Sequence, residues 1–227
     1  MRLVCFDIDG TLIWTDGAGR RAIHRAVGEV LAIEPVANFR FDGRTDGEIV
    51  LRFAAGAGLA PDAELMDRVL ARYVENLGDE LGKPGHATKV YPGVRELLDL
   101  LEPRADCVLG LLTGNVIAGA RLKLRSAGIE PGRFRVGAFG SDSHVRDELP
   151  AVAQARAGAL TGRAIAGPDV VIIGDTPADV RCGRGIGARA IGVATASYSV
   201  EQLVEAGAHV AFADLSDVEA VVEAIFG

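Results

Sequence analysis

Apolar and polar residues alternate along the C-terminal half of the chain in blocks that predict strands followed by helices. The predicted buried strands are short apolar runs at residues 106–112, 170–174, 188–194 and 209–213. The predicted helices lie between and after them, at residues 116–127, 178–185, 201–206 and 217–226. Strands that alternate with helices indicate a parallel sheet with helices on both faces, which is a Rossmann-like α/β fold.

A further strand is predicted at the beginning of the chain. The apolar run at residues 3–6 leads directly into Asp7, Ile8, Asp9 and Gly10. An apolar run that ends in two acids is typical of a buried parallel strand that opens into a loop. The two carboxylates are therefore expected at the end of the strand, within reach of water or a metal ion.

Residues 15–84 show a different pattern, because their apolar residues follow helical spacing and form no series of strands. The strand pattern begins before this segment and resumes after it, and Gly82, Pro84 and Gly85 mark the return. We therefore expect an α/β core formed by residues 1–14 and 85–227, with an inserted all-helical cap domain at residues 15–84.

Composition and charge limit the classes of function. The chain has 227 residues, of which 49% are hydrophobic, enough for one sizeable core with a small insert. Its 24 Lys and Arg residues against 31 Asp and Glu residues give a formal net charge of −7, and no basic run is present. This balance argues against nucleic acid as a partner and favours a small molecule.

The cysteines and the hydropathy indicate where the protein works. Cys5, Cys107 and Cys182 are far apart and odd in number, so the sequence predicts neither a disulfide framework nor a zinc site. No apolar run approaches ~20 residues, and Met1 is not followed by a cationic and apolar leader. We expect a cytoplasmic protein without a membrane partner, either a monomer or a homodimer.

Three predicted strands end in polar groups. The first ends in Asp7 and Asp9, the second in the run Thr113, Gly114 and Asn115, and the third in Asp175, with Asp179 one turn later. Ligands of open α/β sheets bind beyond the carboxyl ends of the strands. If the three strands are neighbours, their ends form one pocket.

The residue types in this pocket suit phosphoryl transfer. Carboxylates such as Asp7 and Asp175 are ligands for Mg²⁺, and a carboxylate at a strand tip can attack a phosphoryl group. Asp9 can protonate a leaving oxygen, and the hydroxyl of Thr113 and the backbone at Gly114 can bind phosphate oxygens. Each motif alone also fits a turn or helix cap, so the functional interpretation depends on their combination.

The motifs resemble those of the haloacid dehalogenase-like hydrolase superfamily, most closely its phosphoglycolate phosphatase-like members. The matching runs are Asp7-Ile8-Asp9-Gly10-Thr11-Leu12, Leu112-Thr113-Gly114-Asn115 and Gly174-Asp175-Thr176-Pro177-Ala178-Asp179. The resemblance implies that Asp7 is the nucleophile, that Asp9 is the general acid and base, and that Thr113 binds phosphate. Gly114 and Asn115, in the same strand end, are further candidates for substrate binding. It also implies Mg²⁺ held by Asp7, the carbonyl of Asp9 and Asp175, with Asp179 acting mainly as support.

One family motif is missing, because the family places a Lys before the last catalytic strand. The only lysines are Lys83, Lys89 and Lys123, none of which lies between residues 139 and 151. Arg146 lies in that segment and is the candidate for the cation that neutralises phosphate and nucleophile. Lys123 is the alternative cation, and an exposed Arg146 paired with Asp147 or Glu148 is the structural alternative.

The insert contains a loop that resembles the family's G-x-T-D substrate loop, at Phe41-Asp42-Gly43-Arg44-Thr45-Asp46. Arg44 and Thr45 are therefore candidates for binding a substrate carboxylate. Thr45 before Asp46 and Glu48 also fits a helix N-cap, and the two interpretations are compatible.

The sequence thus predicts a Mg²⁺-dependent phosphatase for a small phosphomonoester, phosphoglycolate-like or a sugar phosphate, that works through an aspartyl-phosphate under a closing helical lid. The alternatives are a phosphomutase of the β-phosphoglucomutase type and a catalytically silent binding or regulatory protein on the same fold. A dehalogenase is disfavoured, because Asp9 has no role in that chemistry.

Overall fold

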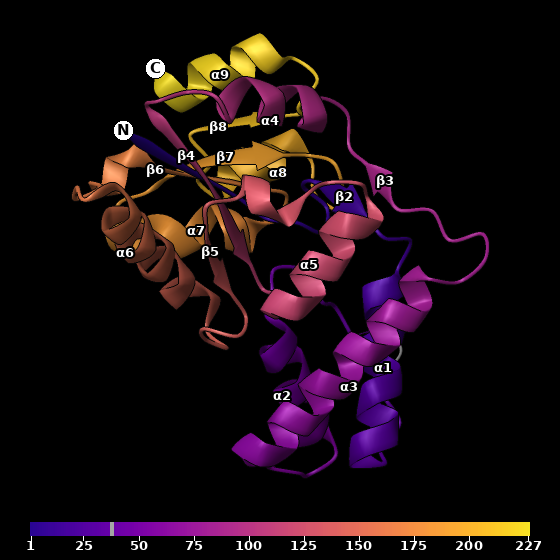
Figure 1. Cartoon of the computed structure of the whole chain (residues 1–227). Coiled ribbons are helices and arrows are strands. Elements are labelled where there is room, and N and C mark those ends of the chain that lie inside the picture. The colour runs from indigo at the N-terminus through magenta and orange to yellow at the C-terminus, as the bar shows by residue number, and fades with distance from the viewer. Residues whose placement is uncertain (37–38) are drawn as a thin grey trace.

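The computed structural model describes residues 1–36 and 39–227, and its centre is a six-stranded parallel sheet (Figure 1). The strands are β1 (Arg2–Phe6), β4 (Cys107–Thr113), β5 (Val136–Phe139), β6 (Val170–Gly174), β7 (Arg189–Val193) and β8 (Val210–Phe212). Their order across the sheet is β5-β4-β1-β6-β7-β8, and all neighbours run parallel. The predicted α/β fold class is confirmed.

Helices cover both faces of this sheet. They are α4 (Val94–Leu101), α5 (Ile117–Ser126), α6 (Leu149–Thr161), α7 (Pro177–Cys182), α8 (Val200–Glu205) and α9 (Val218–Phe226). Short 3₁₀ turns occur at Pro131–Arg133, Arg146–Glu148, Gly167–Asp169 and Gly183–Ile186.

Alternate side chains of strand β1 contribute to two different hydrophobic clusters, one on each face of the sheet. Val4 and Phe6 belong to the hydrophobic cluster that α4, α5 and α9 complete, whereas Leu3 and Cys5 belong to the cluster completed by α6 and α7. Successive side chains of a strand point to opposite faces, so an unbroken apolar run supplies both layers at once.

Three helices in the first third of the chain pack against one another instead of against the sheet (Figure 1). They are α1 (Ala18–Leu31), α2 (Asp46–Gly56) and α3 (Ala63–Leu81), referred to below as the three-helix unit. Its own hydrophobic cluster includes Tyr73 and Leu77 and takes Val116 from the segment before α5. The antiparallel strands β2 (Ile13–Trp14) and β3 (Lys89–Val90) pair where the chain enters and leaves the unit.

The unit matches the helical insert that the periodicity predicts, and the domain boundaries at residues 14 and 84 stay a prediction. Three core elements, β5, α4 and α6, have no counterpart among the predicted elements. Strand β5 is only four residues long and contains Gly137. Helix α6 is rich in alanine, so its buried face differs little in sequence from its other faces. Helix α4 does carry a helical pattern in Val94, Leu97 and Leu98, and that signal was present in the sequence.

The topology brings the three predicted strand ends together. Strand β1 lies between β4 and β6, and Phe6 pairs with Leu111 on one side and Ile173 on the other. In the part of the chain that the structure describes, no helix has the length and apolar character to cross a membrane. All three cysteines are free thiols.

Candidate active site

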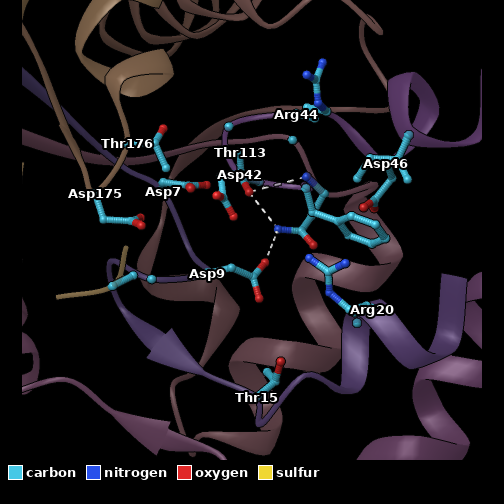
Figure 2. A pocket seen from close by; sticks show the side chains of 18 of the residues that line it. Asp7, Asp9, Thr15, Arg20, Asp42, Arg44, Asp46, Thr113, Asp175 and Thr176 are labelled. Atoms are coloured by element: carbon cyan, nitrogen blue, oxygen red, sulfur yellow. Dashed lines mark hydrogen bonds between the residues drawn. The ribbon is translucent and has the colours of Figure 1, made fainter. Parts of the chain in front are cut away.

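A cavity of about 320 Å³ lies between the carboxyl ends of the strands and the three-helix unit (Figure 2). The core contributes the predicted residues Asp7, Asp9, Thr113, Asn115, Arg146 and Asp175 to its lining. The three-helix unit and the loop before α2 contribute Arg20, Phe41, Arg44 and Asp46. One cavity therefore joins the strand ends to the insert, as the sequence predicts.

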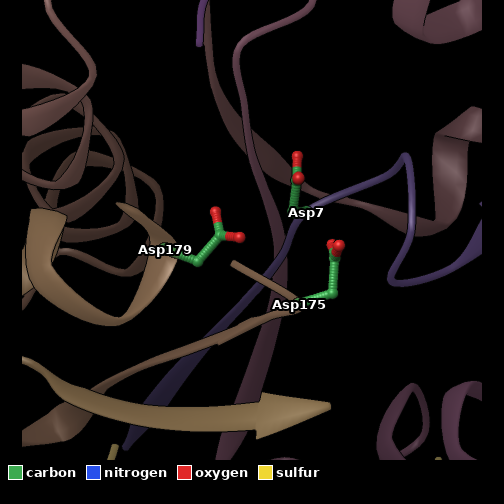
Figure 3. A group of neighbouring side chains, drawn as sticks. All are labelled: Asp7, Asp175 and Asp179. Atoms are coloured by element: carbon green, nitrogen blue, oxygen red, sulfur yellow. The ribbon is translucent and has the colours of Figure 1, made fainter. Parts of the chain in front are cut away.

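Three carboxylates form a cluster at the base of this cavity (Figure 3). One oxygen each of Asp7, Asp175 and Asp179 lies within 4.8 Å of the others, and all three residues are buried. Burial raises the pKa of Asp7 to about 6, although the neighbouring Arg146 opposes the shift. Burial, together with the charges of Asp179 and Asp7, also raises the pKa of Asp175 well above its usual range.

The hydrogen bonds of the cluster distinguish a carboxylate that supports its neighbours from a carboxylate that can bind a metal ion. Asp179 Oδ2 accepts from the backbone N–H and the hydroxyl of Thr176, at 2.9 and 2.7 Å, and Asp179 Oδ1 pairs with Arg146. Asp175 Oδ1 accepts from the Thr11 hydroxyl at 2.9 Å. Both oxygens of Asp179 are engaged within the protein, so this residue supports the cluster. Asp175 Oδ2 has no hydrogen-bond partner among the described residues and is available for a ligand.

The donor set fits a hard divalent cation. Buried carboxylates with raised pKa values are the groups that a bound positive charge would stabilise, and their oxygens are the ligand type that Mg²⁺ prefers. Asp7 and Asp175 are the side chains that the geometry leaves available for it.

Arg146 begins the 3₁₀ turn before α6 and is buried beside Asp7. Its Nη2 lies 3.4 Å from Asp7 Oδ2 and also pairs with Asp179. Its Nε is buried without a hydrogen-bond partner among the described residues. The alternative of an exposed Arg146 is therefore wrong, and a guanidinium lies beside the predicted nucleophile.

Lys123 is also buried, but it serves a different carboxylate. Its Nζ donates to Asp9 Oδ2 and Asn115 Oδ1, both at 2.6 Å. Asn115 Nδ2 donates to Asp9 Oδ2 and to Thr113 Oγ1, both at 2.8 Å. Burial alone would lower the pKa of Lys123, but the charges of Asp9 and its other neighbours raise it above the ordinary value. The structure thus holds Asp9 with an amide and an ammonium group.

Two glycines allow the loops of the site to approach one another. Gly10 has φ of +85°, and a Cβ at this position would overlap the carboxylate of Asp175. Gly114 lies against the insert loop, where a Cβ would overlap the carbonyl oxygen of Arg44. The sequence predicts that the backbone at Gly114 approaches a phosphate group. The structure shows that it also lies against the loop before α2.

Two hydrogen bonds connect that loop to the loop after β4. The Asp46 N–H donates to the Gly114 carbonyl, and the Val116 N–H donates to Asp46 Oδ2, both at 2.8 Å. Burial raises the pKa of Asp46 to about 6, against the lowering effect of Lys123. The sequence pattern places Asp46 at the start of a helix and indicates no contact with the core. The structure shows that contact, a hydrogen bond to Val116, which lies 70 residues later in the chain.

Thr45 and Arg44 differ from the expectation that they bind substrate. The hydroxyl of Thr45 is fully buried, accepts from the Glu48 N–H at 3.1 Å and donates to the His144 carbonyl at 2.9 Å. Thr45 therefore caps α2 and does not line the cavity, which corrects its placement in a substrate site. Arg44 does line the cavity, but its guanidinium forms an ion pair with Glu48.

Arg20 is a cavity residue that the motifs did not indicate. It lies in the first turn of α1, its Nη1 donates to the Phe39 carbonyl at 2.7 Å, and its guanidinium lies 4.1 Å from the centre of the Phe41 ring. No general sequence signal separates it from the other arginines of the insert.

Comparison with known proteins identifies the family. Residues 4–184 match the family model of haloacid dehalogenase-like hydrolase. No curated protein matches the sequence.

Solved structures share the fold at low sequence identity. A hydrolase from Pseudomonas syringae has a TM-score of 0.75 at 20% identity, with 100% of both chains covered. A predicted phosphoglycolate phosphatase from Haemophilus somnus 129PT has a TM-score of 0.71 at 17% sequence identity, with 98% of both chains covered. CbbY from Rhodobacter sphaeroides, solved in complex with phosphate, has a TM-score of 0.74 at 18% sequence identity, with 96% of both chains covered. The family match extends over most of the chain, which therefore belongs to the haloacid dehalogenase-like hydrolases.

Proposed function

We propose that this haloacid dehalogenase-like hydrolase is a Mg²⁺-dependent phosphatase that cleaves small phosphomonoesters through an aspartyl-phosphate. The observation that carries the proposal is the pair of carboxylates at the end of β1. Asp7 lies buried beside the Arg146 guanidinium, and Asp9, two residues later, lines the same cavity and is more exposed. Two neighbouring carboxylates in different environments can serve as a nucleophile and as a general acid and base, respectively.

The chemistry divides between these two residues. The Asp7 carboxylate attacks phosphorus while Asp9 gives a proton to the leaving oxygen, which departs as the alcohol. Asp9 then takes a proton from a water molecule that attacks the aspartyl-phosphate. This second step releases inorganic phosphate and restores the Asp7 carboxylate.

The surrounding donors stabilise the phosphoryl group. Arg146 brings a permanent positive charge to the nucleophile side, where charge on the phosphoryl oxygens must be balanced in the transition state. The Thr113 hydroxyl and the backbone around Gly114 and Asn115 border the same space and are the proposed phosphate ligands. In this proposal Asn115 also orients Asp9 through its amide.

The proposed Mg²⁺ ligands are the Asp7 carboxylate, the Asp9 carbonyl and the Asp175 carboxylate, with Asp179 fixing Arg146 and Thr176 around them. When bound, the ion supplies charge neutralisation and orientation for the phosphate. Arg146 supplies one positive charge to the buried carboxylates, and a bound divalent ion would supply the rest.

The three-helix unit is proposed to act as a lid. Its loop contacts at Asp46 and Thr45 hold it against the core over the cavity, where closure excludes water from the reacting groups. In this reading the unit corresponds to the predicted cap at residues 15–84.

The test is release of inorganic phosphate from a panel of phosphorylated metabolites, including phosphoglycolate and sugar phosphates, with and without Mg²⁺. We expect Mg²⁺-dependent release that chelation abolishes. Asp7→Asn should abolish it while the circular dichroism spectrum is unchanged, and Asp67→Asn, at an exposed acid of α3, is the matched control. Isomerisation without phosphate release would identify a mutase, and neither activity would identify a binding protein.

A further inference from the structure

We infer that Arg20 selects the substrate by binding a second anionic group, a carboxylate or a phosphate, on the part of the molecule that leaves. The inference rests on the proposed function for the direction in which the substrate lies. It assigns a specificity role to a residue outside the sequence motifs.

The charge balance of the cavity distinguishes Arg20 from its neighbours. Lys123 is paired with Asp9, Arg146 with Asp7 and Asp179, and Arg44 with Glu48. Arg20 lines the same cavity and forms no ion pair with a carboxylate among the described residues. A guanidinium is always charged, so an anion that enters the cavity meets a positive charge that no carboxylate of the described residues pairs with.

Two contacts hold Arg20 in place for this role. Its Nη1 donates to the Phe39 carbonyl at 2.7 Å, and the guanidinium lies over the Phe41 ring at 4.1 Å. A planar guanidinium group that these contacts already fix loses little conformational entropy when its remaining N–H groups bind a carboxylate or phosphate. The side chain is only partly buried, which leaves these groups accessible from the cavity.

The position of Arg20 relative to the proposed chemistry indicates which end of the substrate it meets. In the view of Figure 2, Asp9 lies between Arg20 on one side and Asp7 and Asp175 on the other. Asp9 must contact the leaving oxygen to protonate it, while Asp7 approaches phosphorus from the opposite direction. The leaving group therefore extends past Asp9 toward α1 and Arg20.

The N-terminus of α1 adds to the positive electrostatic potential around Arg20. Its N-cap is Gly17, no side chain caps it, and its first turn contains no acidic residue. Gly17 and Gly19 line the cavity together with Arg20. The positive end of the helix dipole and the guanidinium thus favour an anion at one place.

The test compares three esters that share a three-carbon chain: propyl phosphate, 3-(phosphonooxy)propanoate and propane-1,3-diol bisphosphate. The wild-type protein should prefer at least one charged tail over propyl phosphate, and the preferred ester distinguishes a carboxylate from a phosphate. Arg20→Gln should lower kcat/KM for that ester roughly 10- to 100-fold, mainly through KM, because a charged hydrogen-bond donor is lost. Propyl phosphate should be unaffected, and Arg20→Lys should retain part of the preference.

Arg25→Gln is the matched control, because Arg25 lies on the same helix, is partly exposed like Arg20 and pairs with Asp79. An equal loss for all three esters in both Arg20 variants, or a wild-type protein without preference for a charged tail, would overturn the inference. A binding measurement separates this result from the proposed function. Calorimetry on the Asp7→Asn protein should show tighter binding of the charged ester than of propyl phosphate, and a further Arg20→Gln change should abolish the difference. That result without phosphate release in the wild type would uphold Arg20 and refute the phosphatase.

Discussion

The ammonium group of Lys123 lies 2.6 Å from the carboxylate of Asp9, the proposed general acid and base. Arg146 lies 3.4 Å from the carboxylate of Asp7. The family pattern requires one cation, and the sequence left Arg146 and Lys123 as alternatives. The structure gives each predicted catalytic carboxylate a cation of its own, so the two basic residues have separate effects to test.

Arg146→Ala should lower kcat/KM by roughly a hundredfold or more, because a buried charge next to the phosphoryl group contributes several kcal/mol in the transition state. Arg146→Lys should retain part of the activity, since the positive charge remains while the bidentate hydrogen-bond geometry of the guanidinium is lost. Steady-state kinetics on the ester with the highest wild-type activity would measure both effects. Unchanged kinetics in the Arg146→Ala protein would contradict the assignment.

Lys123→Ala should differ from Arg146→Ala in how the protein binds phosphate. Lys123 contacts Asp9 and Asn115, so its loss should reduce kcat through the orientation of Asp9. The inhibition constant for inorganic phosphate should change little in Lys123→Ala and rise in Arg146→Ala. The reverse pattern would place the phosphate-neutralising charge on Lys123.

Asp9→Asn should reduce kcat strongly with only a small change in the Mg²⁺ concentration needed for activity. The side chain is the proposed acid and base, whereas the proposed metal ligand is the backbone carbonyl, which the substitution keeps. Kinetics at varied Mg²⁺ would separate the two effects. A protein with normal kcat that needs more Mg²⁺ for activity would show that the carboxylate acts on the metal.

The sequence predicted the parts of the site that depend on strand order. Asp7, Thr113 and Asp175 each follow an apolar run, and in parallel sheets the ends of such runs lie on one edge. It was less informative where contacts join distant segments with ordinary local patterns. Asp46 bonds to Val116, and Arg20 is distinctive only because the other cavity cations are paired. Such properties depend on packing across the chain, which periodicity does not encode.

Gly114→Ala should separate the two loops that meet over the cavity. A Cβ at residue 114 would overlap the Arg44 carbonyl and approach the backbone of Thr45, and backbone atoms cannot rotate away as a flexible side chain can. We expect kcat/KM to fall at least ~10-fold, because displaced loops no longer position the site. Gly56→Ala, at a position where a Cβ meets nothing within 4 Å, is the control. Equal activity of the two variants would show that the loop contact is unimportant for turnover.

Asp46 provides a prediction for stability as a function of pH. Burial raises its pKa from the ordinary value of 3.8 to about 6 in the folded protein. An acid with a raised pKa favours folding while it is protonated. That contribution is fully present below pH 3.8 and is lost as the pH rises through about 6.

Asp46→Asn should therefore stabilise the protein at neutral pH and have little effect in acid. The side chain of Asn stays neutral and its oxygen can still accept from the Val116 N–H, so the substitution removes mainly the cost of a buried charge. The difference between 3.8 and about 6 corresponds to ~3 kcal/mol, which is the largest gain expected in the unfolding free energy. Denaturant unfolding of both proteins from about pH 4 to about pH 7.5 would measure this gain, with Asp67→Asn as the exposed control. A gain that does not grow with pH, or a loss at neutral pH, would mean that attraction to Lys123 outweighs the burial of Asp46.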